Sequence, residues 1–215
     1  MRRILTASVA LLALVGPAAA EQGDLLVRGR VIAIVPTEDT SAVLPAFPTG
    51  SVDVENTVVP ELDFTYFVKD QWAVELILAT SPHDLVGAGA LEGLDEVGKV
   101  WVLPPTLTLQ YHFRPNAQVR PYAGVGVNYT LFYNESASSS LEGAIGNTGI
   151  DLDDSFGVAF QAGVDVALND NWFANLDVKY IQIDTDARLA TGPATNTVEV
   201  DLDPVVAGIG IGRRF

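Results

Sequence analysis

Hydrophobic and polar side chains alternate along most of this chain in short segments. In the segment 205–215, Val205, Ile209, Ile211 and Phe215 fall on one face of an extended strand, and glycines occupy most of the other face. A membrane-crossing strand needs about 9–11 residues, which this segment supplies. Because no later segment covers its edge, we expect this strand to pair within a sheet, and in hydrocarbon only a closed barrel leaves no free edge.

The same alternation predicts seven further strands, at 25–35, 58–68, 72–79, 101–113, 123–132, 155–168 and 172–180. Short and long connections follow one another strictly. The long ones are 36–57, 81–100, 134–153 and 185–197, and the third is rich in Ser and Gly, so we expect it to be mobile. This pattern predicts an all-β fold, an eight-stranded antiparallel transmembrane β-barrel with short periplasmic turns and long extracellular loops.

A soluble eight-stranded barrel of the lipocalin type is the alternative, and it would turn its apolar face inward. Here the more polar face carries many charges, including Arg28, Arg30, Asp63 and Asp177, which suits a lumen. The opposite face is apolar and carries aromatic residues near the strand ends, as expected for contact with lipid. The distribution therefore favours the membrane barrel.

The beginning of the chain reads as an export signal. Arg2 and Arg3 precede an apolar segment, and Ala18 to Ala20 form a small-residue cleavage site. We therefore expect residues 1–20 to be a cleaved signal peptide and residues 21–215 to be a single barrel domain in the outer membrane of a Gram-negative bacterial cell. Without Arg2 and Arg3 the formal charge changes from −15 to −17, which argues against nucleic acid as a partner.

Four stretches resemble a known family. They are LPPTLTLQYHF at 103–113, RPYAGVGVNYTLFY at 120–133, DLDDSFGVAFQAGVDVAL at 151–168, and the C-terminal region with Asp203-Pro204 and the ending RRF. Together they are similar to the outer membrane protein W family (OmpW-like). The resemblance implies an eight-stranded barrel with a narrow, largely hydrophobic lumen that takes small hydrophobic molecules across the outer membrane. The sequence departs from the family at two positions. Members often carry an aromatic residue where this chain has Lys179, and tyrosine where it has Arg213.

The heights of the inward-facing residues predict two layers in the lumen. The upper layer is an apolar cup whose candidate substrate contacts are Ile32, Ile34, Ile77, Val102, Phe132, Ile181 and Leu202. The lower layer is an ionic floor formed by Arg28, Arg30, Glu61, Asp63, Glu75, Asp177 and Lys179. An eight-stranded barrel is only wide enough for its own side chains, and buried charges must pair, so we expect ion pairs here. The floor is either a structural plug or a gated or proton-linked path.

Pro104 and Pro105 lie within the predicted strand 101–113 and cannot donate hydrogen bonds to a neighbouring strand. One interpretation is a lateral opening through which an apolar molecule leaves the cup for lipid. The other is a strand that begins where pairing has already ended.

The long loops are acidic and could hold calcium or bridge it to lipopolysaccharide phosphates, but no spacing matches a calcium-loop motif, so a solvated surface is favoured. With two histidines and no cysteine, we expect no catalytic residues, no metal and no cofactor. The leading hypothesis is a channel or carrier for small hydrophobic solutes. The rival is a structural, receptor or adhesion barrel that acts through its acidic loops with a closed lumen. We expect a monomer in contact with outer-membrane lipid and lipopolysaccharide.

Overall fold

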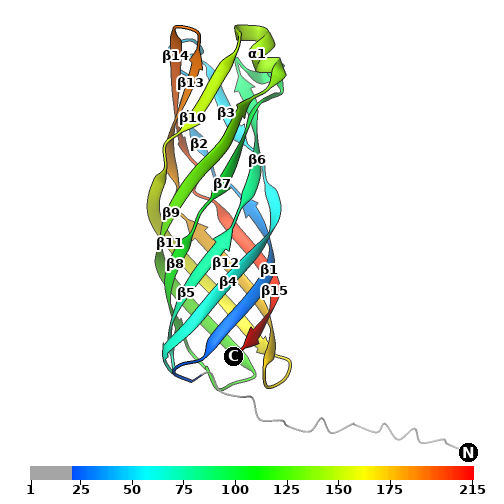
Figure 1. Cartoon of the computed structure of the whole chain (residues 1–215), viewed down its shortest axis with the longest axis vertical. Helices are drawn as coiled ribbons and strands as arrows, with labels where there is room; N and C mark the ends of the chain where they lie inside the picture. The colour runs from blue at the N-terminus through cyan, green and yellow to red at the C-terminus, as the bar shows by residue number, and fades with distance from the viewer. Residues whose placement is uncertain (1–20) are drawn as a thin grey trace, which may run out of the picture.

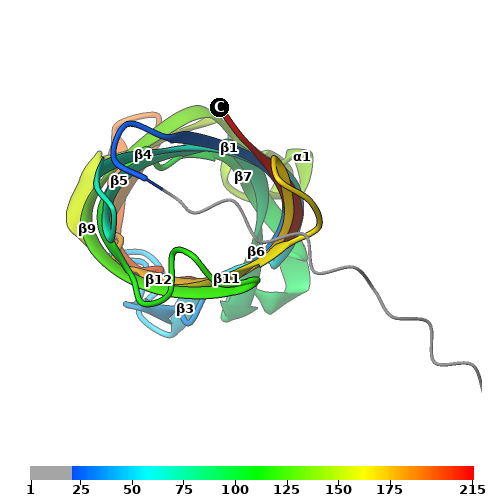
Figure 2. The ribbon, with the colours of Figure 1, turned by 90° about the horizontal axis from the view of Figure 1, so that it is seen from below.

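A computed structural model describes residues 21–215, so the predicted signal peptide lies outside the described residues. Eight antiparallel strands form a closed barrel (Figures 1 and 2): β1 (Leu25–Val35), β4 (Thr57–Lys69), β5 (Trp72–Ala79), β8 (Thr106–His112), β9 (Val119–Ala137), β11 (Ser155–Ala167), β12 (Trp172–Ile181) and β15 (Val205–Arg214). The pairing of β9 with β11 closes the ring, and β15 pairs with β1 on one edge and β12 on the other. The predicted fold class is confirmed.

Alternation along each strand sorts side chains between lipid and lumen. On β1, Val31 is 56% exposed on the outer surface, whereas Arg28 and Arg30 face inward and are buried. Aromatic residues mark both rims: Trp72 packs edge-on against Tyr111 near the short turns, and Tyr129 and Tyr180 donate hydrogen bonds to Asp154 and Asp203 near the other end. This facing is that of a membrane barrel and excludes the lipocalin alternative.

Among residues 21–215 no helix is long and apolar enough to cross a membrane. The described part of the chain contains two short helices, η1 (Glu92–Leu94) and α1 (Ser139–Ile145), and α1 lies at the outer end of the molecule in Figure 1.

Above the barrel, the long connections form strands of their own: β2 (Asp39–Thr40), β3 (Gly50–Val54), β6 (Ser81–Gly89), β7 (Glu96–Leu103), β10 (Thr148–Leu152), β13 (Asp184–Thr191) and β14 (Ala194–Asp201). β3, β6 and β7 continue the barrel wall upward along the long strand β9, and β10, β13, β14 and β2 form a second sheet. The barrel therefore carries a β-structured extracellular extension.

Two sequence-based expectations were wrong in detail. The expected mobile loop 134–153 contains the end of β9, α1 and β10; Ser138 caps α1 by accepting a hydrogen bond from the backbone N–H of Leu141, 3.1 Å away. The expected single strand 101–113 is interrupted at Pro104 and Pro105, which separate β7 from β8 because neither proline can donate to a neighbouring strand.

Candidate functional site

The lower half of the lumen contains a dense network of buried ion pairs. Arg28 contacts three carboxylates: Nη1 lies 2.9 Å from Asp63 Oδ1 and 3.4 Å from Glu75 Oε1, and Nη2 lies 3.0 Å from Asp165 Oδ2. The register of β1 and β4 places Arg28 directly opposite Asp63, whereas Asp165 comes from β11 across the barrel. The network thus ties opposite walls together.

A second group of charges lies directly above the first. Arg30 pairs with Glu61 and with Asp63, whose Oδ2 is 2.8 Å from Arg30 Nη2. Lys179 Nζ lies 2.7 Å from Asp177 Oδ1 and 3.3 Å from Glu61 Oε2. The structure therefore brings all seven residues of the predicted ionic floor together, and the charge at position 179 is neutralised within it.

Uncharged polar side chains that the sequence did not single out complete the network. Tyr122 OH donates to Asp177 Oδ2 at 2.7 Å, and Gln161 Nε2 donates to the same oxygen at 2.9 Å. Thr108 Oγ1 donates to Glu75 Oε2 at 3.1 Å. Their inward position on alternating strands was the available signal, but which carboxylate each would meet depends on the barrel's shape.

Glycines on β15 make room for the arginines. Gly210 and Gly212 lie opposite Arg30 and Arg28 in the register of β1 and β15. A Cβ atom at Gly210 would come within 2.7 Å of Arg30 Cγ, and one at Gly212 within 2.9 Å of Arg28 Cγ. The glycine face of β15 therefore leaves the space that the arginine side chains and the Phe173 ring occupy.

Below the charges, Leu26, Phe67, Ala73 and Phe173 form a small apolar cluster toward the periplasmic end. All of these side chains are almost fully buried, as are those of the ionic floor. The lower lumen is filled with side chains, so within residues 21–215 no broad aqueous pore runs along the axis.

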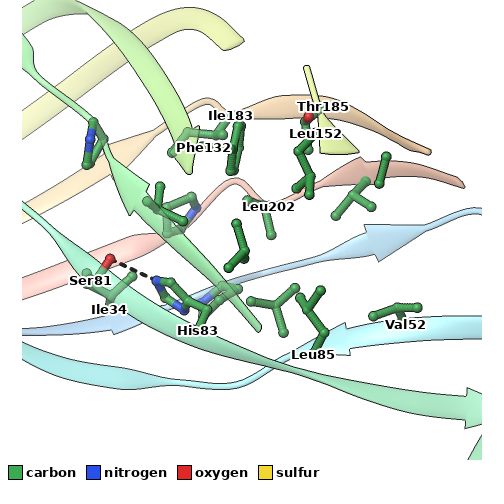
Figure 3. Close-up of a pocket in the computed structure, with 18 of the residues that line it drawn as sticks. Ile34, Val52, Ser81, His83, Leu85, Phe132, Leu152, Ile183, Thr185 and Leu202 are labelled. Atoms are coloured by element: carbon green, nitrogen blue, oxygen red, sulfur yellow. Dashed lines mark hydrogen bonds between the residues drawn. The ribbon is translucent and has the colours of Figure 1, made fainter. Parts of the chain in front are cut away.

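Above the ionic floor lies an apolar cavity of about 80 Å³, shown in Figure 3. Five of the seven predicted contacts line it: Ile34, Val102, Phe132, Ile181 and Leu202. Ile32 and Ile77 are buried inward-facing residues but do not line it. Most of the other lining residues come from the extracellular extension, including Val52, Leu85, Leu152 and Leu189, in segments that were expected to be loops.

Pro104 also lines this cavity, next to an interruption in the wall. Strand pairing runs up to Ile77 opposite Thr106 and resumes with Ser81 opposite Val102. Between these positions the side chain of Thr80 donates to Val102 O at 3.2 Å. On the other side the prolines are held, because the Tyr129 N–H donates to Pro105 O at 3.1 Å. The strand pairing of the wall is thus interrupted between Leu78–Thr80 and the two prolines.

A second interruption of the strand pairing lies where β1 ends and β4 begins. Pro36 and Val54 line both the cavity and an outer recess that also includes Glu38 and Glu55. Glu38 accepts a hydrogen bond of 2.6 Å from the Val54 N–H, and burial raises the pKa of the Glu38 carboxyl. This recess opens among acidic groups above the membrane-spanning strands, so it faces water.

Residues 21–215 match the family model described as the OmpW family. This chain belongs to the OmpW family. Outer membrane protein W of Salmonella typhimurium is 35% identical to it, with the whole of both chains covered. The crystal structure of the outer membrane protein OprG from Pseudomonas aeruginosa superposes with a TM-score of 0.85 at 32% identity, covering 93% of this chain and 99% of that one. The protein is therefore an outer-membrane β-barrel.

A further relative is the dibenzothiophene metabolism operon protein DoxH of Pseudomonas sp. (strain C18). It is 36% identical over 169 residues, which are 78% of this chain and 76% of DoxH.

Proposed function

We propose that this OmpW-family barrel is a non-enzymatic carrier that takes small hydrophobic molecules from the extracellular side into the upper cavity and releases them sideways into the outer membrane. The observation that carries the proposal is an apolar cavity placed directly on an ionic floor. An apolar molecule gains by leaving water for the cavity, but it cannot cross a layer of paired buried charges without breaking them.

The exit is the wall at Pro104 and Pro105. Leu78 and Leu107 flank it on the outer surface and are exposed where lipid would contact the barrel. Since two consecutive residues of the wall have no N–H to donate, separating the strands there breaks fewer hydrogen bonds than anywhere else along β5 and β8. A molecule that leaves at this height enters hydrocarbon directly.

The entrance is the recess at Pro36 and Val54, because it shares these two residues with the cavity and opens among the carboxylates Glu38 and Glu55. Such an acidic rim stays hydrated, which suits a path from water to the cavity and not a path to lipid. DoxH, by its name, comes from an operon for the metabolism of an apolar aromatic compound, and it supports an apolar solute for this barrel as well.

The test is the transfer of a poorly soluble apolar dye into liposomes with lipopolysaccharide in their outer leaflet, with and without the protein. Val198 lines the cavity from β14, and its neighbour Thr197 is exposed on the outer surface. Val198→Asp should reduce the protein-dependent rate about tenfold or more, because a charge in an apolar cavity opposes entry. Thr197→Asp should transfer dye at the wild-type rate. Equal rates for the two variants, both shown to be folded barrels, would contradict the cavity route.

A second function, a receptor or adhesion barrel, has its own supporting observation. Asp153, Asp154, Asp184, Asp186, Glu199 and Asp201 line a recess on the extracellular surface. Arg188 neutralises part of it, lying 2.6 Å from Asp153 and lowering the pKa of that carboxyl, while partial burial and the carboxylates of Asp201 and Asp203 raise the pKa of Asp184. Within residues 21–215 no three His, Asp or Glu side chains are grouped to hold a metal.

Replacing Asp154, Asp184 and Asp201 by asparagine separates the two functions. Dye transfer should survive this change, whereas attachment of the protein to lipopolysaccharide through bridging calcium should weaken if the acidic recess is the functional surface. We further propose that the barrel acts as a monomer, because the exit at Pro104 must face lipid and the barrel exposes apolar side chains on its outer surface.

A further inference from the structure

The cavity is apolar except at three side chains. Ser81 and His83 on β6 lie on one side, and Thr185 on β13 lies on another; all other lining residues are aliphatic, aromatic or proline. Figure 3 shows Ser81 bonded to His83 among hydrocarbon side chains. These groups are nearly inaccessible from outside, with Ser81 2% and His83 6% exposed. A buried polar group inside an apolar cavity can only serve its neighbours or a molecule bound there.

The hydrogen-bond directions at His83 are fixed by its partners. His83 Nδ1 lies 3.1 Å from the backbone carbonyl of Glu55, which can only accept, so Nδ1 carries the proton. Burial lowers the pKa of His83, outweighing the nearby Asp84 carboxylate, so the ring is neutral and Nε2 is an acceptor. The Ser81 hydroxyl, 2.9 Å from Nε2, must therefore donate its proton to His83.

The Thr185 hydroxyl is engaged in the same way. Its Oγ1 donates to the backbone carbonyl of Asp153 at 2.6 Å. Each of the three polar side chains of the cavity thus donates its polar hydrogen to another residue of the protein. These side chains can therefore offer a bound molecule only hydrogen-bond acceptors. Ser81 Oγ is such an acceptor, because it forms no other hydrogen bond among the described residues.

We infer that the cavity selects apolar molecules that carry one hydroxyl group, alcohols and phenols, over hydrocarbons and ethers of the same size, with Ser81 Oγ as the acceptor for that hydroxyl. This inference rests on the proposed function and names its substrate class. A phenol that enters an apolar cavity must give up its hydrogen bond to water, and only an acceptor in the wall can replace it. An ether brings a second acceptor and gains nothing from Ser81.

The expected preference is modest. One hydrogen bond of this kind contributes a net factor of about 3 to 10 in affinity. The probes are p-cresol, p-xylene and 4-methylanisole, in which a hydroxyl is exchanged for a methyl or methoxy group on one ring. Binding is followed through the methyl NMR signals of Ile34, Ile181 and Ile183, which line the cavity, with the protein in nanodiscs and with partitioning measured on empty nanodiscs.

The wild type should bind p-cresol about 3- to 10-fold more tightly than either other probe. Ser81→Ala alone would expose His83 Nε2 as a substitute acceptor, so the informative variant is Ser81→Ala with His83→Phe. It should lose the preference for p-cresol over p-xylene. Ser136→Ala, on the exposed part of β9, is the control and should change nothing.

The outcomes are distinct. If no probe shifts the three isoleucine signals, the proposed function fails with the inference. If p-xylene binds and p-cresol binds no better, or if the double variant keeps the preference, the cavity stands and the role of Ser81 is overturned.

Discussion

Asp63 is central to the ionic floor, because it is fully buried and lies 2.9 Å from Arg28 Nη1 and 2.8 Å from Arg30 Nη2. Lys179 in turn pairs with two carboxylates, those of Glu61 and Asp177. Apart from Lys179 and Asp177, which both lie on β12, the paired cations and carboxylates belong to different strands, so these pairs also hold two parts of the wall together. We therefore expect a single substitution in the ionic floor to destabilise the whole barrel.

We predict that Asp63→Asn lowers the free energy of unfolding by about 3–5 kcal/mol, because it leaves two buried guanidinium groups with less negative charge than they need. The measurement is urea unfolding of the lipid-embedded protein. The control is Asp84→Asn, which breaks a surface pair with Lys99 in which both side chains are exposed to water. A loss of stability as large for Asp84→Asn as for Asp63→Asn would show that burial of the network is not what matters.

At the scale of the element, β15 combines two requirements on its two faces. Val205, Ile209 and Ile211 face outward, and the glycines between them leave space for side chains from β1. The sequence predicts the alternation, since Val205, Ile209 and Ile211 recur at every second position with Ala207 between them. It does not predict the purpose of the glycines, because this depends on the register with β1.

Gly210→Ala should destabilise the barrel by about 1–3 kcal/mol, since the new methyl group would collide with Arg30 Cγ and with the backbone carbonyl of Gly29. Gly29→Ala is the matched control on the neighbouring strand, where an added Cβ meets nothing within 4 Å. Both are measured by the same urea titration. Indistinguishable midpoints for the two variants would mean that the arginine stems do not need the space at Gly210.

At the scale of the whole molecule, the proposed path requires the wall between β5 and β8 to separate near the two prolines. The chain has no cysteine, so a disulfide can be introduced without competing thiols. Thr80 and Leu103 occupy the next antiparallel position after Ser81 and Val102, on the outer face. Directly opposite residues in such strands are close enough to be bridged.

The double variant Thr80→Cys/Leu103→Cys should transfer the apolar dye at least about tenfold more slowly when oxidised than when reduced with dithiothreitol, if passage sideways is the main route. Leu76→Cys/Leu107→Cys closes a pair that is already held in the sheet and should have no such effect. If both variants transfer dye at the same rate when oxidised and when reduced, the exit at the prolines is excluded. The cavity would then still be tested by Val198→Asp.

Much of the architecture could be predicted from local sequence alone. The strands β1, β4, β5, β11 and β12 lie within a residue or two of the expected bounds, because alternation is a property of neighbouring residues. The extracellular extension was missed although β13 also alternates, with Thr185, Ala187 and Leu189 buried. Short alternating segments among glycines and acidic residues resemble loops unless their sheet partners are known.

The sequence by itself determined which face of each strand meets lipid, that charges gather low in the lumen and apolar residues above them, and where two prolines interrupt the wall. Only the tertiary structure decided that Asp165 reaches Arg28 from across the barrel, that β10, β13 and β14 complete the cavity, and that Ser81 and His83 meet inside it. The physical reason is that facing follows from the two-residue repeat of a strand. Which side chains contact one another depends instead on how distant strands come together when the barrel closes.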